Sequence, residues 1–388
     1  MSSMNFMKKL LVDVEVQWKA LEEVCRFING RAYKQPELLG QGKYPVLRVG
    51  NFFTNDNWYY SDLELDEDKY CDKGDLLYAW SASFGPRIWE GDKVIYHYHI
   101  WKVMPDADVI NKKFLYYLLE WDMKALKEEH GTGSTMMHVT KGAIEQRLVP
   151  IPCPENPQRS LEIQAEIVSI LDAFTELTAE LNVELTARKK QYNYYRDQLL
   201  SFDEGEVEWK TLEEVAKIGT GSHDTQDAID DGDYIFYARG REPLRLNVFD
   251  FDETAIITAG DGAGVGKVFH YTQGKYALHQ RAYRIVPSEV MEPRFVYHCM
   301  RSYFYAYIQK ASVSSSVTSL RRPMFLNFPI PVPSLSEQAR IVAILDKFDI
   351  LTNSISEGLP REIALRQKQY EHYRDLLLSF PKPEEVGA

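Results

Sequence analysis

A glycine-rich loop at residues 260–267 suggests chemistry, because its composition is typical of a phosphate-binding loop. The Walker spacing requires glycine at position 261 and serine or threonine at 268, where Asp261 and Val268 stand. The dinucleotide-binding pattern fails as well. A tight glycine turn between two strands is therefore the favoured interpretation. The alternative is a loop whose Asp261 and Lys267 approach a nucleic acid closely.

Several arginines stand in polar, glycine-containing segments: Arg31, Arg48, Arg239 and Arg241 lie near or beside glycines, and Arg87 follows Gly85-Pro86. An arginine fork can bind a guanine edge with two hydrogen bonds or anchor a phosphate. A surface salt bridge is the alternative for each of them.

Hydroxyl-rich stretches occur late in each half of the chain and favour phosphate contacts, since hydroxyl and guanidinium groups both serve there. The second half supplies Ser315, Ser316, Thr318, Arg321 and Arg322, and the first half supplies Ser134, Thr135 and Lys141. Trp80, Ser81 and Ser83 lie where the first half would carry the counterpart of the glycine loop.

Histidines occur in two strand-like segments, at His97 and His99 and again at His279. Residues two apart on a strand face the same side, as metal ligands do, but no carboxylate or cysteine nearby completes a ligand set. Aromatic packing on a sheet is the favoured interpretation, and no metal site is predicted. Gln280 and Arg281 are better candidates for base contacts. Asn51 can pair with adenine or cap a turn, so both readings stay open.

The chain has 388 residues, enough for two or three domains. Its four cysteines are scattered without a CxxC pair, so neither a zinc ribbon nor a disulfide framework is indicated. Its apolar runs are shorter than the roughly 20 residues needed to cross a bilayer. Residues 10–12 form an apolar patch too short for a signal peptide. We therefore expect a cytoplasmic, globular protein.

The net charge of −12 argues against a nucleic-acid partner until its distribution is considered. Residues 151–208 carry 5 basic and 12 acidic side chains, whereas residues 209–330 carry 14 of each. Residues 18–150 carry 17 basic and 20 acidic side chains. A basic surface can therefore exist on either near-neutral segment, because clustering rather than the total decides the local field.

The chain is an internal duplication. Three of the repeated pairs are Val16–Val24 with Val207–Val215, Pro150–Pro154 with Pro329–Pro333, and Ala165–Asp172 with Ala339–Asp346. A period near 180 residues indicates a duplicated domain rather than a solenoid of 20–50-residue repeats. Each copy consists of a mixed segment, a proline-rich hinge and a helical segment.

The pattern of the mixed segments predicts an α+β fold. Residues 93–103 and 276–286 are strand-like, and helices are expected at 112–127 and 294–309. Residues 160–202 carry a heptad seam and predict one long helix. The second copy repeats the seam but breaks at Gly358-Leu359-Pro360. Since one such helix cannot bury its seam alone, we expect two long helices packed antiparallel between two pseudo-symmetric mixed α/β domains.

Two similar domains held at a fixed separation suggest a ruler for duplex DNA, whose half-sites recur about every 34–36 Å on one face. The shared framework with different polar residues predicts a split, asymmetric target. The chain resembles, over essentially its full length, the specificity subunit of type I restriction–modification systems. The resemblance is carried by Trp18–Val24 and Trp209–Val215, Gly74–Ser83, the Pro-Ile-Pro exits at 150–152 and 329–331, and the helix starts at 162–164 and 337–338.

The resemblance implies two target recognition domains, binding to two modification subunits that methylate adenine, and recruitment of up to two restriction subunits. It implies no catalysis by this chain, so S-adenosylmethionine, ATP and Mg would be used by the partner subunits. We found no methylation motif, helicase box or convincing nuclease cluster. The expected segments are 1–17 (packing near the C-terminal helix), 18–150 (first recognition domain), 151–208 (first helical region), 209–330 (second recognition domain) and 331–388 (second helical region).

Aromatic and basic residues near the helix ends are candidates for docking partner subunits: Tyr192, Tyr195, Arg196, Tyr370, Tyr373 and Arg374. Packing within the helix pair is the favoured alternative for the tyrosines. Two alternatives to the whole assignment stay open: a protein-only coiled-coil scaffold, and a duplicated nuclease or methyltransferase with unrecognised sites.

Overall fold

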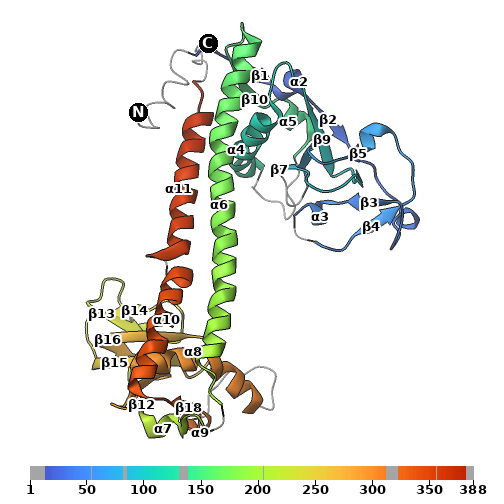
Figure 1. Ribbon diagram of the computed structural model, residues 1–388. Helices are drawn as coiled ribbons and strands as arrows, with labels where there is room; N and C mark the ends of the chain where they lie inside the picture. Colours follow the sequence, from blue (N-terminus) through green and yellow to red (C-terminus); the bar gives the residue numbers. More distant parts are fainter. Residues whose placement is uncertain are drawn as a thin grey trace. The chain divides into compact units, whose positions relative to one another are not determined.

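The computed structural model describes residues 14–53, 55–81, 85–130, 139–203, 205–311, 322–354 and 356–381. The chain divides into two compact units (Figure 1). The first comprises residues 1–180 and 364–388, and the second comprises residues 181–363. The predicted class is confirmed: the fold is α+β, with a sheet domain in each unit and long helices that pack together. No helix among these residues is long and apolar enough to cross a membrane.

The described part of the first unit contains two four-stranded sheets and a two-stranded ribbon. One sheet has the order β2 (Cys25–Asn29), β9 (Ile100–Pro105), β6 (Leu76–Ala79), β7 (Gly85–Ile88), and the other has the order β4 (Tyr59–Ser61), β3 (Tyr44–Leu47), β8 (Val94–Tyr96), β5 (Tyr70–Cys71). The ribbon pairs β1 (Val16–Ala20) with β10 (Leu148–Pro152), and the helices are α2 (Leu21–Val24), α3 (Val49–Phe53), α4 (Lys112–His130) and α5 (Lys141–Glu145).

The second unit repeats this plan with one larger sheet in its described residues. Its order is β12 (Ala216–Thr220), β17 (Ala282–Pro287), β15 (Phe251–Ala259), β16 (Phe269–Leu278), β13 (Tyr234–Tyr237), β14 (Leu244–Leu246). The ribbon pairs β11 (Glu208–Thr211) with β18 (Pro329–Val332), and the helices of this domain are α7 (Leu212–Val215), α8 (Pro293–Ala311) and α9 (Arg322–Leu326).

A single strand explains why one copy has one sheet and the other has two. In the second unit β16 pairs with β15 along one edge and with β13 along the other. In the first unit the equivalent segment is broken into β7 and β8, which pair with β6 and β3 respectively. The break at residues 89–93 therefore separates the sheets without changing the order of the strand partners.

The strand-like runs at 93–103 and 276–286 each contain parts of two strands, with the histidines in the turn between them rather than on a strand. A tight turn divides each of them, between β8 and β9 in the first unit and between β16 and β17 in the second. The aromatic and β-branched composition is shared by the two flanking strands, so it conceals the turn between them.

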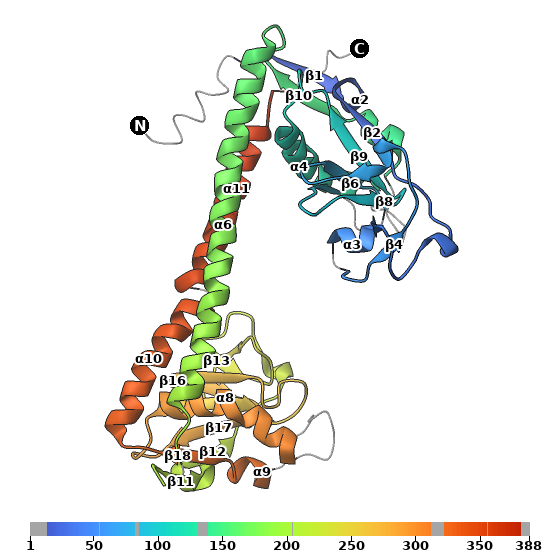
Figure 2. The ribbon, with the colours of Figure 1, turned by 45° about the vertical axis from the view of Figure 1, so that its right-hand side comes forward.

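The predicted long helix is α6 (Pro157–Leu199), 43 residues without a break. In the first unit its apolar seam packs on α4 and, antiparallel, on α11 (Gly358–Leu378), where Phe174 stacks on Tyr373 (Figures 1 and 2). In the second unit its last turns pack on α10 (Leu335–Asn353), where Tyr195 stacks on Phe348.

The predicted break in the second copy lies between α10 and α11. Gly358 adopts φ +72°, and a Cβ atom there would lie 2.4 Å from the carbonyl oxygen of Ile350. A side chain at this position would therefore clash with the backbone of the preceding helix, which explains the glycine.

A buried glutamine ties each sheet domain to its helix. The amide of Gln164 accepts the backbone N–H of Asn111 (2.7 Å) and donates to the carbonyl of Val109 (3.1 Å). Gln338 likewise accepts the N–H of Glu292 (2.7 Å) and donates to the carbonyl of Val290 (3.1 Å). Both glutamines are fully buried. An amide suits the position because it satisfies a donor and an acceptor together.

We expect Gln338→Ala to lower the free energy of unfolding by about 1–3 kcal/mol, since it leaves the N–H of Glu292 without its partner. Gln367→Ala, at an exposed position of α11, is the control and should change it by less than about 0.5 kcal/mol. Urea unfolding of the full chain measures both. Equal stability of the two variants would contradict the role of the buried amide.

Candidate nucleic-acid interface

Several candidate reading residues lie at one end of each sheet, and the helical segments attach at the other end. In the second unit β17 begins at the turn after His279 and ends at Pro287, shortly before α8. In the first unit β9 begins at the turn after His97 and ends at Pro105. Each strand therefore separates a loop-rich end, suited to contact a ligand, from an end anchored on helices.

Two arginines in the second unit share one carboxylate. Arg239 donates to Oδ1 of Asp261 and Arg281 donates to Oδ2, each at 3.0 Å. Burial alone would raise the pKa of Asp261, but the hydrogen bonds from both guanidinium groups outweigh it and the pKa is lowered. Asp261 is thus held ionised, and the Arg281 side chain remains 63% exposed. Three of the predicted residues, from three separate loops, thus come together at one carboxylate.

Further polar groups surround this pair. Gln280 donates to Asp224 at 3.0 Å and is exposed beside Arg281. Arg241 is exposed and has no ion-pair partner among the described residues. A cleft of about 580 Å³ is lined by Arg239, Arg241, Asp261 and residues 262–264 of the glycine turn. Lys267 instead lies over the ring of Tyr305, 4.9 Å from its centroid. The glycine loop itself connects β15 and β16, as the favoured interpretation expected.

The equivalent end of the first unit is aromatic. Trp80 follows β6 and donates its indole N–H to the carbonyl of Tyr98 at 2.8 Å. Its ring meets His99 edge-on at 4.9 Å, and Tyr98 lies 4.0 Å from the His99 ring. Tyr98 is 38% exposed. Sequence reasoning missed Tyr98, although the alignment of 97–105 with 279–287 places it opposite Gln280.

Several predicted residues of the first unit are occupied by contacts within the chain. Arg31 forms a two-point ion pair with Glu37, at 3.0 and 2.8 Å. Arg48 lies over the ring of Tyr59 at 4.3 Å. The Asn51 amide donates to the carbonyls at 55 and 57, which is the capping role.

The remaining predicted residues of the first unit are also placed by the structure. Arg87 donates to the carbonyl of Phe52. Lys141 is exposed and pairs with Glu145 at 3.3 Å. Ser81 is 4% exposed, so its side chain is buried in this structure, in contrast to the exposed position that the prediction assumed.

Part of the predicted set lies outside the described residues: Ser83, Ser134, Thr135, Ser315, Ser316, Thr318 and Arg321. Arg322 is described and stands exposed at the first position of α9.

The candidate docking tyrosines mostly pack inside their own unit. Tyr192 is buried beside Phe348, and Tyr373 stacks on Phe174. Tyr370 is partly buried and donates to Glu120 at 3.4 Å. Arg196 and Arg374 lie over Tyr192 and Tyr370 and pair with the following aspartates. Tyr195 stacks on Phe348 but keeps 40% of its surface exposed.

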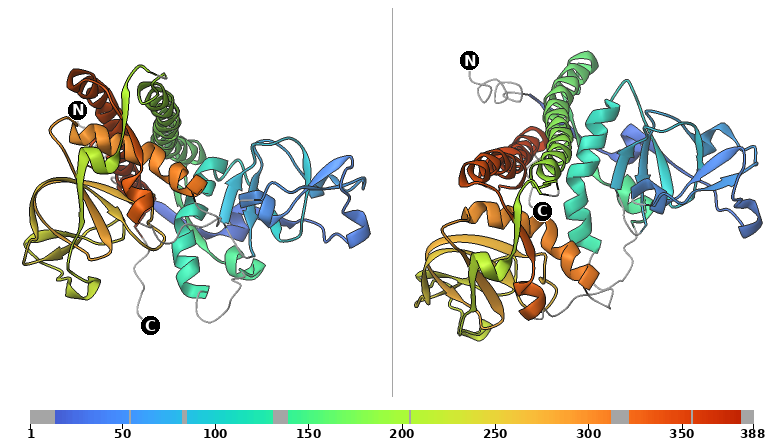
Figure 3. Two further views of the ribbon diagram at one scale, coloured as in Figure 1. Left: turned by 90° about the horizontal axis from the view of Figure 1, so that it is seen from below. Right: turned by 60° about the horizontal axis from the view of Figure 1, so that its bottom comes forward.

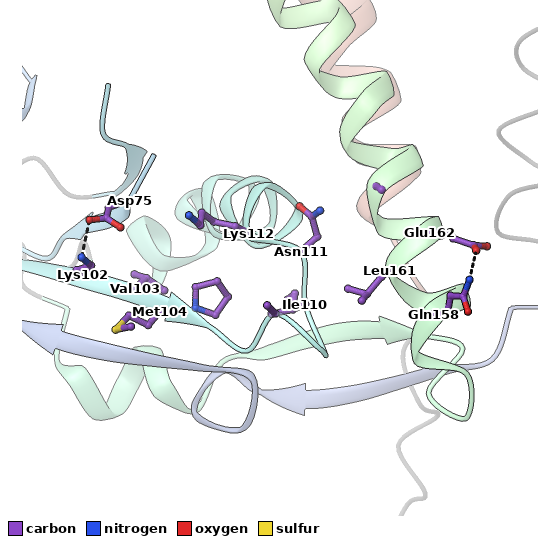
Figure 4. A pocket seen from close by; sticks show the side chains of 13 residues that line it. Asp75, Lys102, Val103, Met104, Ile110, Asn111, Lys112, Gln158, Leu161 and Glu162 are labelled. Carbon is purple, nitrogen blue, oxygen red and sulfur yellow. Dashed lines mark hydrogen bonds and ion pairs between the residues drawn. The ribbon is translucent and has the colours of Figure 1, made fainter. Parts of the chain in front are cut away.

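A second hollow, of about 760 Å³, lies in the first unit between the end of β9 and the first turns of α6 (Figure 4). Val103, Met104, Ile110 and Leu161 line it, with the Asp75–Lys102 ion pair (2.6 Å) at one edge. It lies at the helix-anchored end of the strand, so it is separate from the aromatic cluster.

Within the residues described, no group of three or more histidine, cysteine, aspartate or glutamate side chains could hold a metal ion.

Comparisons with known proteins address the family directly. The model of the type I restriction modification DNA specificity domain matches the chain twice, over residues 13–188 and 204–365. The chain belongs to this family. It is a specificity subunit of a type I restriction–modification system, which is a non-catalytic subunit, and the nuclease or methyltransferase alternative is set aside.

The specificity subunit of the Escherichia coli type I restriction enzyme EcoR124I/EcoR124II is 37% identical over 421 aligned residues, covering 100% of both chains. The crystal structure of a type I specificity subunit from M. genitalium shares the fold, with a TM-score of 0.65 and 16% identity over 96% of this chain and 98% of that chain. A chain from a structural study of complex assembly and conformational transition of the type I system has a TM-score of 0.60 and 15% identity, covering 96% of this chain and 99% of that one.

The pKa of His97, in the first unit, makes the stability of the subunit depend on pH. Burial, followed by the neighbouring His99 and Arg48 charges, lowers the pKa of His97 to about 4, whereas an unfolded histidine titrates near 6.5. Between these values the unfolded subunit binds more protons than the folded one, so stability is lost as the pH falls. We expect His97→Asn to lose less stability than the wild type between pH 6.5 and 4, as measured by urea unfolding. An identical pH dependence would contradict this.

Proposed function

We propose that this specificity subunit reads a split, asymmetric DNA sequence, with one recognition domain for each half-site. The observation that carries the proposal is the difference between two equivalent turns: the second domain presents Gln280 and Arg281 where the first presents Tyr98 and His99. Because the surrounding backbone is the same, the two domains offer different side chains from the same place. A site read by both therefore has unlike halves separated by an unread spacer.

The side chains favour different base chemistry in the two halves. Arg281 and Arg239, aligned by one ionised carboxylate, suit the O6 and N7 acceptors of guanine. Gln280 suits the N6 and N7 edge of adenine. The aromatic tip of the first domain suits apolar contact, as with the methyl group of thymine. Arg241 and Arg322, both exposed, suit phosphates.

The subunit is further proposed to be the assembly platform for two modification subunits and up to two restriction subunits, which would use S-adenosylmethionine, ATP and Mg. The family membership supports this, as does the fold shared with a chain studied for complex assembly of a type I system. The exposed rings of Tyr194 and Tyr195, 62% and 40% exposed, are the candidate docking groups on α6. We also propose that the two recognition domains span residues 18–150 and 209–330, and that the two helical regions span residues 151–208 and 331–388.

The proposal is tested by co-expressing the subunit with its modification subunit and mapping adenine methylation on a plasmid by long-read sequencing. A split, asymmetric motif supports it. No methylation by an intact complex would contradict it and favour the protein-only scaffold.

Substitution of Arg281 should relax one half of that motif. We expect Arg281→Ala to cost about 1–3 kcal/mol of discrimination at one guanine position, roughly a 5- to 150-fold loss, and to leave the other half unchanged. Tyr98→Ala should affect only the other half. Arg340→Ala, on the exposed surface of α10, is the control and should leave the whole motif intact. Relaxation of both halves by Arg281→Ala would contradict separate reading.

The helices are proposed to set the spacer between the half-sites. Four residues inserted after Leu181 lengthen α6 by about 6 Å, and base pairs stack about 3.4 Å apart. The methylated motif should then gain one or two spacer base pairs with both halves unchanged. The same insertion in the surface turn after Asp231 is the control. An unchanged spacer in an active complex would show that the helices do not act as a ruler.

A further inference from the structure

We infer that His97 and His279 are positioning residues, each of which uses its imidazole as a hydrogen-bond acceptor to hold the turn whose two tip side chains read DNA. This inference rests on the proposed function. We name the segments 97–100 and 279–282 the histidine turns. They connect β8 to β9 and β16 to β17.

The same hydrogen bonds recur in both turns. The histidine N–H donates to a carbonyl of the parallel strand, that of Leu47 (2.9 Å) or Tyr237 (3.0 Å). The next N–H donates to the carbonyl of Arg31 (3.1 Å) or His223 (2.9 Å). The fourth residue donates back to the histidine carbonyl, at 2.9 Å in the first turn and 3.0 Å in the second.

The third N–H of each turn has a side-chain acceptor. His99 N donates to Nδ1 of His97 at 3.5 Å, and Arg281 N donates to Nδ1 of His279 at 2.9 Å. The imidazole thus supplies the acceptor that the backbone does not offer, and every N–H of the turn is bonded. Backbone groups that are bonded throughout define one conformation, so the tip side chains leave the turn in a fixed direction.

The bonding pattern requires a neutral ring. Nδ1 accepts, so the proton of the neutral imidazole lies on Nε2, and a second proton would place two donors face to face. His279 is 2% exposed and stacks on Phe236. Burial, followed by the charge of Arg239, lowers its pKa, which favours the neutral form. The groups facing its ring edge are Asp224, with a carboxylate oxygen 3.8 Å from Nε2, together with Asp261 and Arg281.

The frame is common to both domains, whereas the tips differ. The carbonyl of the third turn residue accepts an N–H from the strand end opposite, that of Trp80 in one domain and Gly260 in the other. These same strand ends supply Trp80 beside Tyr98, and Asp261 beside Arg281. Each histidine therefore lies behind side chains that differ between the domains and are exposed or partly exposed. A substitution among those side chains need not disturb the hydrogen bond that supports the turn.

A histidine that only fills the core would tolerate any ring of similar size, so the test separates volume from hydrogen bonding. His279→Phe keeps an aromatic ring against Phe236 but removes the acceptor. His279→Asn restores an acceptor, because an asparagine Oδ1 commonly accepts the N–H two residues further on. Each variant is co-expressed with the modification subunit, and methylated sites are mapped by long-read sequencing.

We expect His279→Phe to reduce discrimination in one half-site at least about fivefold while the other half stays as in the wild type. His279→Asn should restore most of that discrimination. His97→Phe and His97→Asn should show the same contrast in the opposite half-site. An unchanged motif for His279→Phe, equal effects of Phe and Asn, or loss of both halves together would each overturn the inference.

A second measurement does not depend on methylation. Hydrogen–deuterium exchange of the full chain should show faster exchange of the Arg281 amide in His279→Phe than in His279→Asn or the wild type. Equal exchange in all three proteins would overturn the inference. A wild-type complex that methylates no split motif would instead contradict the proposed function, so the two failures are distinguishable.

Discussion

The apolar seam along α6 is the constraint on which the rest of the structure depends. A 43-residue helix with a continuous apolar stripe is unstable in water unless other elements cover that stripe. In the first unit α4 and α11 cover it, and in the second unit α8 and α10 do so. Each recognition domain therefore takes part in the same apolar core as its helices, rather than being attached through a loose linker.

Attachment of each domain combines apolar packing with specific polar contacts. In the second unit α8 lies between the sheet and α10 (Figure 3). Arg294 and His298 of α8 bind Asp346 on α10. In the first unit Lys113 and Tyr117 of α4 bind Asp172 on α6. Together with the buried Gln164 and Gln338, these contacts fix the orientation of each domain on its helix. Directional polar contacts of this kind, above all those of the two buried glutamines, specify one geometry more strictly than apolar packing alone.

The anchored end and the variable end of each domain lie at opposite ends of the same strands. This separation lets the tip residues differ between the two copies while the helix contacts remain alike. The pair Arg239 and Arg281 on Asp261 has no counterpart at the aromatic tip of Trp80, Tyr98 and His99. The two domains therefore present unlike side chains on a common frame, which is the observation behind the proposed asymmetric target.

The sequence by itself determined the duplication, the α+β class, the long helix with its seam and the break before α11. These features follow from local periodicity, from glycine and proline positions, and from repeats. All of these can be recognised in the sequence without knowing which distant residues are in contact. The resemblance to the specificity subunits rested on the same repeated segments, and the family comparison confirms it.

The tertiary structure alone decided which polar residues share a site. Arg239, Asp261 and Arg281 are each about twenty residues from the next, so the sequence does not show that they meet. Ser81 and Gln280 are both polar residues, and only the structure shows that Ser81 is buried and Gln280 is exposed. The turn at His97 and His279 was hidden because its acceptor is a side chain and its partners come from parallel strands far along the chain. Hydrogen bonds between distant segments leave no local pattern, so they emerge only when the chain folds.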